Sequence, residues 1–187
     1  EPTGAALQGQ KTVSGRDWNQ DESYTFNLAA ATDDASVTGL DKTTAQAVAD
    51  GAVAINASQA TATAPESGRV ASFAFGTEAA PAVTFNRAGT FSFNITENAA
   101  QDGQAGMSMD KHTARATVVV TDLDESGKHT GKLVSSVTYA NTDASDADKA
   151  VTDKAAFTNA YHASGTFGGV TVSKTLQGRA STAGQFT

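Results

Sequence analysis

The sequence has no cysteine, three prolines and one tryptophan, and aromatic residues make up only 7% of its 187 positions. Without cysteine, disulfide bonds and thiolate metal sites are excluded. The 13 basic and 20 acidic side chains give a net charge of −7, and no basic cluster occurs, which argues against nucleic-acid and anionic-membrane partners. No apolar run is long enough to predict a transmembrane helix. If a covalent crosslink stabilises this chain, it is therefore expected to be of another kind than a disulfide.

What the chain does have is a series of short segments in which apolar and polar residues alternate. A period of two is typical of strands with one buried face. The predicted strands are residues 24–28, 70–75, 83–85, 91–97, 111–121, 132–139 and 157–161. Residues 44–50 are predicted as a short helix capped by Thr43 or Thr44, and residues 122–131 as a turn-rich connection. This pattern predicts an all-β, Ig-like or Cna-B-like β-sandwich with at most a short helix in loop insertions.

A long-range repeat indicates the domain organisation. Lys11 opens the motif KTVSGR, and Lys174, 163 positions later (174 − 11), opens KTLQGR. Such a repeat, in a chain that starts without methionine, predicts a piece of a tandem array. We expect a linker from a preceding region, one complete domain, and then a linker with the truncated start of the next domain, at residues 1–9, 10–163 and 164–187.

Three polar residues fall on the apolar sides of predicted strands: Lys11, Glu97 and Asn159. For each residue alone, a strand end that reaches solvent is an equally good interpretation. Together they form an amine, a carboxyl and a carboxamide, which is a reactive set. Burial makes a lysine lose its proton and a glutamate keep one. The amine is then able to attack the side-chain carbonyl of Asn159, expel ammonia and leave an amide crosslink, while Glu97 polarises that carbonyl and shuttles protons.

Four stretches, in order, resemble the streptococcal pilin isopeptide-linkage domain. They are KTVSGR with the strand at 24–28, the strand at 91–97, the aspartate-led stretch at 107–122, and the Phe-x-Asn-x-Tyr strand at 157–161. The similarity extends over residues 10–162. It implies that Lys11 and Asn159 are the crosslink partners and Glu97 the catalytic acid. It also implies that Lys174 is the crosslink lysine of the next domain, whose partner is not in this chain.

The resemblance implies a structural stalk domain of a Gram-positive cell-surface adhesin or pilus protein, extracellular and anchored to the cell wall. Its partners would be neighbouring tandem domains, with a host ligand reached through other domains, and no cofactor or enzymatic turnover is expected. A Tyr-Pro-Lys pilin motif is absent, which favours an adhesin repeat over a polymerising subunit. The alternative is a ligand-binding adhesin domain that recognises a host glycan or protein through the unassigned region 29–85. A secreted enzyme is a weaker rival, since no converging polar residues are seen.

Two other sets of polar residues are assigned to the surface. Asp122, Asp124 and Ser126 match the first half of a calcium loop, but the twelfth position is Leu133 instead of glutamate, so a hairpin turn is favoured. The histidines share no metal-ligand spacing, and the aspartates of the loops are expected to be solvated, so no metal site is predicted. These residues are His112, His129, His162, Asp33, Asp34, Asp143, Asp146 and Asp148.

Overall fold

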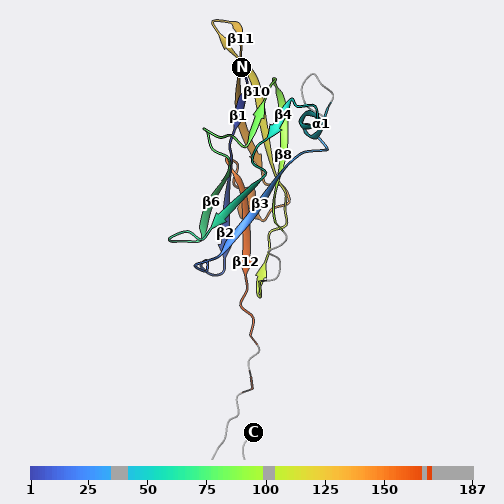
Figure 1. Cartoon of the computed structure of the whole chain (residues 1–187). Helices are drawn as coiled ribbons and strands as arrows, with labels where there is room; N and C mark the ends of the chain where they lie inside the picture. Colours follow the sequence, from blue (N-terminus) through green and yellow to red (C-terminus); the bar gives the residue numbers. More distant parts are fainter. Residues whose placement is uncertain (35–41, 99–103, 166–167, 170–187) are drawn as a thin grey trace, which may run out of the picture.

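The computed structural model describes residues 1–34, 42–98, 104–165 and 168–169, and Lys174 with the second copy of the motif lies outside these residues. The described part is an elongated β structure (Figure 1). Its helices are α1 (Thr44–Ala49) and α2 (Asp146–Lys149). Its strands are β1 (Thr3–Ala5), β2 (Leu7–Ser14), β3 (Ser23–Ala30), β4 (Val53–Ile55), β5 (Gln59–Thr63), β6 (Val70–Phe75), β7 (Val83–Phe85), β8 (Gly89–Glu97), β9 (Met107–Ser108), β10 (Ala114–Glu125), β11 (Lys128–Ala140) and β12 (Ala155–Tyr161).

These strands form three sheets. The largest has the order β11-β10-β8-β3-β5, the second β6-β2-β12-β9, and the smallest β1-β7-β4. Among the strand pairs of the described residues, only β2 with β12 is parallel. The N-terminus lies near one end of the long axis, and β12 leaves the fold at the other end (Figure 1). The first long strand and the last strand therefore run side by side in the same direction.

The core is an aromatic layer between the five-stranded and four-stranded sheets. Phe26 of β3 stacks on Phe73 of β6 with ring centroids 3.9 Å apart, and Phe157 of β12 lies 5.0 Å from Phe26. All three rings are buried. Burying a side chain of this size contributes about 1.5–3 kcal/mol, so this contact holds the two layers together. The predicted all-β sandwich with short helices is confirmed.

Most predicted strands are present, with longer bounds in several cases. The connection at 122–131 was predicted as turn-rich, but β10 and β11 extend through most of it, and Ser126 and Gly127, both with positive φ, make the turn. A register shift between Asp122 and Asp124 bends this hairpin. The Asp122 carboxylate accepts hydrogen bonds from the main-chain N–H groups of Thr130 and Gly131. Its role in the structure is thus to hold the hairpin.

Residues near the start and in region 29–85 add strands that the alternation pattern did not predict. Residues 3–5, within the predicted linker 1–9, form β1 and pair with β7, and β2 begins at Leu7. The described part of 29–85 supplies α1 and strands β4 to β7, whose buried residues join the core. Short strands of alanine and threonine carry too weak a hydropathy alternation to be recognised.

Helix α1 begins as predicted, with Thr43 as N-cap in a capping box with Gln46. Its first residue, Thr44, donates main-chain and hydroxyl hydrogen bonds to Asp34. Asp34 is buried, so its assignment to solvated loop charge was wrong. Neither helix in the described part is long and apolar enough to cross a membrane.

Candidate functional site

Lys11 lies in the core on β2. The buried face of this strand carries Leu7, Gly9, Lys11 and Val13, because alternate side chains point the same way. Lys11 has no exposed surface, and its Nζ donates a hydrogen bond to Glu97 Oε2 at 2.5 Å. The same nitrogen lies 4.7 Å from the centre of the Tyr24 ring. The predicted inward orientation of Lys11 is confirmed.

Glu97 reaches the site from the opposite sheet. It is the last residue of β8, and the exposed fraction of its side chain is only 3%. Its two carboxylate oxygens have different partners: Oε2 accepts from Lys11, and Oε1 accepts from Asn159 Nδ2 at 2.8 Å. One carboxylate thus bridges the amine and the carboxamide.

Asn159 lies on β12, next to Lys11 in the parallel pair of strands. Lys11 is paired with Phe157 and Val13 with Asn159, so Lys11 and Asn159 are diagonal neighbours on one face. Asn159 is fully buried. Its Oδ1 accepts a hydrogen bond from the main-chain N–H of Asp110 at 2.8 Å, and its Nδ2 also lies 3.3 Å from Met109 Sδ. The carboxamide is therefore held at both ends.

Burial changes the protonation of the amine and the carboxyl group. Removal from solvent lowers the pKa of Lys11 below its usual 10.5, although Glu97 opposes the shift. Removal from solvent raises the pKa of Glu97 above its usual 4.5, and here Lys11 opposes it. Both directions favour the uncharged forms. The site therefore favours movement of a proton from Lys11 to Glu97, which would leave a nucleophilic amine beside the carboxamide.

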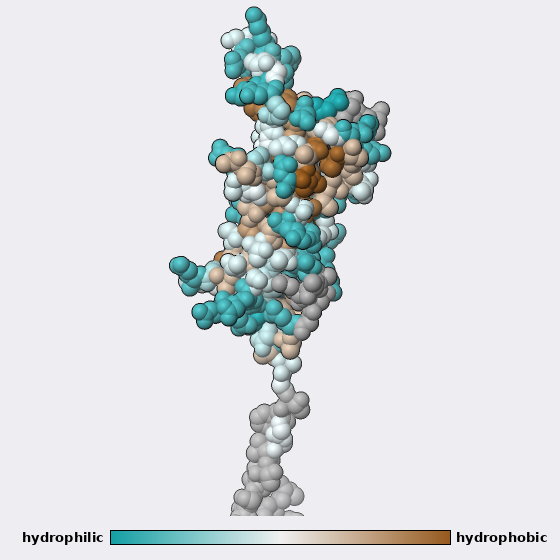
Figure 2. Space-filling view, viewed as in Figure 1, coloured by the Kyte–Doolittle hydropathy of each residue, from teal (hydrophilic) through white to brown (hydrophobic). Residues whose placement is uncertain are grey.

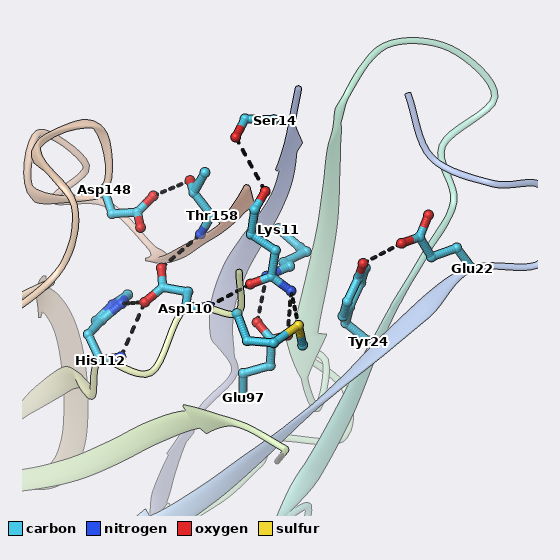
Figure 3. A network of polar contacts seen from close by, with 11 residues as sticks. Lys11, Ser14, Glu22, Tyr24, Glu97, Asp110, His112, Asp148 and Thr158 are labelled. Atoms are coloured by element: carbon cyan, nitrogen blue, oxygen red, sulfur yellow. Dashed lines mark hydrogen bonds and ion pairs between the residues drawn. The ribbon is translucent and has the colours of Figure 1, made fainter. Parts of the chain in front are cut away.

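A second polar group, made of Asp110, His112 and Asp148, packs against β12 (Figure 3). The Asp110 carboxylate accepts hydrogen bonds from the main-chain N–H of Thr158 at 2.8 Å and from His112 Nδ1 at 2.5 Å. Asp148 accepts a hydrogen bond from the Thr158 hydroxyl at 2.5 Å. Asp110 belongs to the segment between β9 and β10, and Asp148 to α2. The group thus ties both segments to the residue before Asn159.

Two assignments to the surface were wrong in this group. His112 is 6% exposed and stacks on Phe157 with ring centroids 4.5 Å apart, and Asp148 is 2% exposed. Burial raises the pKa of Asp148 above its usual 3.8, and the neighbouring Asp110 adds to the shift. Burial acts to raise the pKa of Asp110 too, but its hydrogen bonds outweigh this and hold that pKa below its ordinary range.

In the described part of the chain, the donor atoms of these three residues come close enough together to hold a metal ion. One donor atom from each of Asp110, His112 and Asp148 lies within 4.8 Å of the others. However, both oxygens of Asp110, Oδ1 of Asp148 and Nδ1 of His112 already take part in hydrogen bonds within the protein. These hydrogen bonds make the group a structural clamp on β12, and Nε2 of His112 and Oδ2 of Asp148 are buried without a hydrogen-bond partner among the described residues.

A third cluster lies beside the site, at the connection between β2 and β3. Glu22 accepts two hydrogen bonds from the Arg16 guanidinium and one from the Tyr24 hydroxyl. Burial opposes ionisation of Glu22, but these donors outweigh it and lower its pKa to about 2. The Arg16 guanidinium also lies over the Tyr161 ring. Through Glu22, the arginine of the KTVSGR motif thus holds Tyr24, whose ring lies beside Lys11 Nζ.

A known protein family matches most of the chain. A model of the FctA family, described as the Spy0128-like isopeptide containing domain, matches residues 7–162, which is more than half of the chain. The chain belongs to this family. The resemblance to a pilin isopeptide-linkage domain is thereby confirmed. Among curated protein sequences, none matches the chain significantly.

Solved structures of a major pilin from Streptococcus pyogenes share the family fold. A mutant with glutamate changed to alanine aligns at 16% identity and a TM-score of 0.54, over 85% of this chain and 51% of that chain. A mutant with asparagine changed to alanine aligns at 15% identity and 0.54, with the same coverage. Another major pilin protein of this species aligns at 18% identity and 0.50, over 85% and 52%. The chain therefore spans about half the length of these pilins.

Sequence patterns found part of the site in this family member and missed the rest. The three residues chosen by alternation, Lys11, Glu97 and Asn159, meet in one hydrogen-bonded group. Asp110 and Met109, which contact Asn159, were not chosen as site residues, because their segment shows no regular alternation. Asp110 lies near the start of the stretch 107–122 that resembles the family, and this was the one available signal.

Proposed function

We propose that this domain is a structural module of a pilus or adhesin stalk, locked by an intramolecular isopeptide bond between Lys11 and Asn159 that forms with the help of Glu97. One observation carries the proposal: Lys11 Nζ and Asn159 Nδ2 bind the two oxygens of one buried carboxylate. Membership of an isopeptide-containing family and similarity to pilin structures support it. The boundaries of the module are proposed to be residues 10 and 163, with Lys174 serving the next module.

The reaction starts with proton transfer from the Lys11 ammonium to Glu97, in the direction that burial favours. The Lys11 amine attacks Asn159 Cγ, a C–N bond forms, and the electron pair of the carbonyl moves to Oδ1. Glu97 returns its proton to the Asn159 Nδ2 group, which leaves as ammonia when the carbonyl re-forms. The new amide nitrogen then loses its extra proton to Glu97. The Lys11–Glu97 ion pair and the Asn159 carboxamide thus become an amide, ammonia and a neutral Glu97 carboxyl group.

Confinement of the Lys11 amine and the Asn159 carboxamide accounts for much of the rate of the crosslinking reaction. Both reacting side chains lack exposed surface and share one partner, so neither needs to be brought from solvent to react. Intramolecular groups held in such a way reach effective molarities of roughly 10⁵–10⁸ M. The reaction consumes its own side chains, and the domain is therefore a product of the chemistry and not an enzyme with turnover.

The position of the bond suits a domain under tension. Lys11 lies in the first long strand and Asn159 in the last, and these strands are parallel neighbours. A pull on the two ends of the domain passes from β2 through the crosslink into β12, and the sheets between them carry little load. An extracellular stalk on a Gram-positive surface, anchored to the cell wall and linked to neighbouring domains, is the setting in which this property is useful.

Ligand recognition through region 29–85 is not favoured by a specific observation. In its described part this region provides α1 and the strands β4 to β7, and its residues Val53, Phe73 and Phe85 are buried in the core. It serves as scaffold. A host ligand is accordingly assigned to other parts of the parent protein.

Intact-mass spectrometry of the purified folded chain tests the proposal. Loss of one ammonia would make the chain about 17 Da lighter than its sequence mass. Asn159→Ala and Lys11→Ala chains should have their full sequence mass. The Lys154→Ala chain is the matched control, since this lysine lies outside the site, and it should still show the loss. A wild-type chain at full mass after folding would contradict the proposal.

A further inference from the structure

The oxygen of the Asn159 carboxamide does not face Glu97. It faces the main-chain N–H of Asp110, at 2.8 Å, while Glu97 accepts from the amide nitrogen. A main-chain N–H is only a donor and a carboxylate only an acceptor, so these two partners fix which end of the carboxamide is which. The structure thus differs from the expectation that Glu97 polarises the carbonyl: another group holds the oxygen.

We propose that the main-chain N–H of Asp110 is the oxyanion donor of the crosslinking reaction. This inference rests on the proposed function. When the Lys11 amine attacks Cγ, negative charge develops on Asn159 Oδ1, and the Asp110 N–H already points at that atom. Donors that are aligned before the reaction stabilise such charge without reorganisation. Glu97 is then free to act on protons alone, between the incoming and the leaving nitrogen.

The Asp110 side chain keeps its own main chain in position. Its carboxylate accepts from the N–H of Thr158, the residue before Asn159, and from the N–H and Nδ1 of His112. One set of bonds therefore attaches the loop that carries the donor to the strand that carries the acceptor. Figure 3 shows the carboxylate directed toward His112 and Thr158. Its negative charge is engaged there by three hydrogen bonds, which limits its repulsion of the developing oxyanion.

Surrounding contacts strengthen this arrangement. Asp148 accepts a hydrogen bond from the Thr158 hydroxyl, and the His112 ring stacks on Phe157. The position of the Asp110 N–H is thus determined by contacts with strand β12 and helix α2. In a site without solvent, a fixed dipole of this kind acts more strongly than in water. Asp110 is a positioning residue through its side chain and a catalytic one through its main chain.

The test replaces single main-chain amides by esters. Cell-free translation with an α-hydroxy acid at position 110 removes the N–H and keeps the carboxylate, and timed acid quenching followed by intact-mass measurement gives the rate of ammonia loss. Removal of one such donor should slow the loss about 10²–10³-fold. The same replacement at Thr130 is the matched control, since its N–H donates to the Asp122 carboxylate in the β10–β11 hairpin and to no residue of the site. That chain should react within a few-fold of the wild type.

Two further readouts separate catalysis from folding. The same esters in a Lys11→Ala chain, where no bond forms, give the cost of each ester in melting temperature. The slowing at position 110 should be the same factor at every pH, because the donor does not titrate. A position-110 ester that reacts as fast as the wild type, or at the same rate as the position-130 ester, overturns the inference while the crosslink stands. A wild-type chain that keeps its ammonia removes the proposed function, and the inference with it.

Discussion

Lys11 and Asn159, 148 positions apart in the sequence (159 − 11), lie two register positions apart on parallel neighbouring strands. Both side chains point to the same buried face, where Glu97 from the opposite sheet contacts each of them. This relationship joins the first long strand to the last at the centre of the sandwich. It is the basis of the predictions that follow.

Replacement of Glu97 by alanine should prevent the crosslink. Without the carboxylate, Lys11 has no group to take its proton, and the leaving nitrogen has no group to supply one. The Glu97→Ala chain should keep its full sequence mass after days at neutral pH and melt at a lower temperature than the wild type. Glu66→Ala, which removes an exposed glutamate, is the control and should lose ammonia normally. A crosslinked Glu97→Ala chain would exclude Glu97 from the reaction.

The rate of ammonia loss should depend on pH with a bell shape. In the fully protonated pair, Lys11 is an ammonium and Glu97 a neutral carboxyl group. The reactive form of the pair has lost one of these protons. Because the pKa of Glu97 is raised above 4.5, the acid side of the bell should lie above pH 4.5. Because the pKa of Lys11 is lowered below 10.5, the alkaline side should lie below pH 10.5. Quenched translation reactions across this range measure the profile, and a rate independent of pH would contradict the proton transfers.

The crosslink should determine how far the domain extends under force. Residues 12–158, 147 in number (158 − 12 + 1), lie between the joined side chains and should be shielded. In single-molecule pulling, Asn159→Ala should release about 500 Å of contour length that the wild type does not release, at 3.3–3.6 Å per residue. Its free energy of unfolding should also fall by about 4–5 kcal/mol, from loop closure in the unfolded state. Equal extension of the two chains would show that no covalent bond bypasses the sheets.

Glu22 should make stability depend on acid pH. Its pKa falls from 4.5 unfolded to about 2 folded, so its contribution is present above pH 4.5 and is lost as the pH falls toward 2. In a Lys11→Ala background, which allows reversible unfolding, Glu22→Gln should lower the free energy of unfolding at pH 7 by about 1–3 kcal/mol. The difference should shrink between pH 4.5 and pH 2. Asp21→Asn, an exposed neighbour, should show neither effect.

Part of this molecule follows from local sequence rules. Alternation with a period of two was enough to place Lys11, Glu97 and Asn159 on the inner faces of β2, β8 and β12. The N-cap of α1 was predicted as Thr43 or Thr44, and it is Thr43. Strands of alanine and threonine such as β5 were missed, because small and weakly polar side chains produce little alternation. The aspartates in loops were predicted to be solvated because local composition does not indicate whether a side chain is buried.

In the strands with clear alternation, the sequence alone indicated which residues face inward, since successive side chains of a strand point to opposite faces. Only the tertiary structure decided that β2 and β12 are parallel neighbours, that β8 faces them from the other sheet, and that Asp110 turns its N–H toward Asn159. These relations join segments far apart in the chain, and strand order and sheet packing come from the burial of the whole core. No window of sequence contains that information. The reactive groups were therefore visible in the sequence, and their meeting was a consequence of the fold.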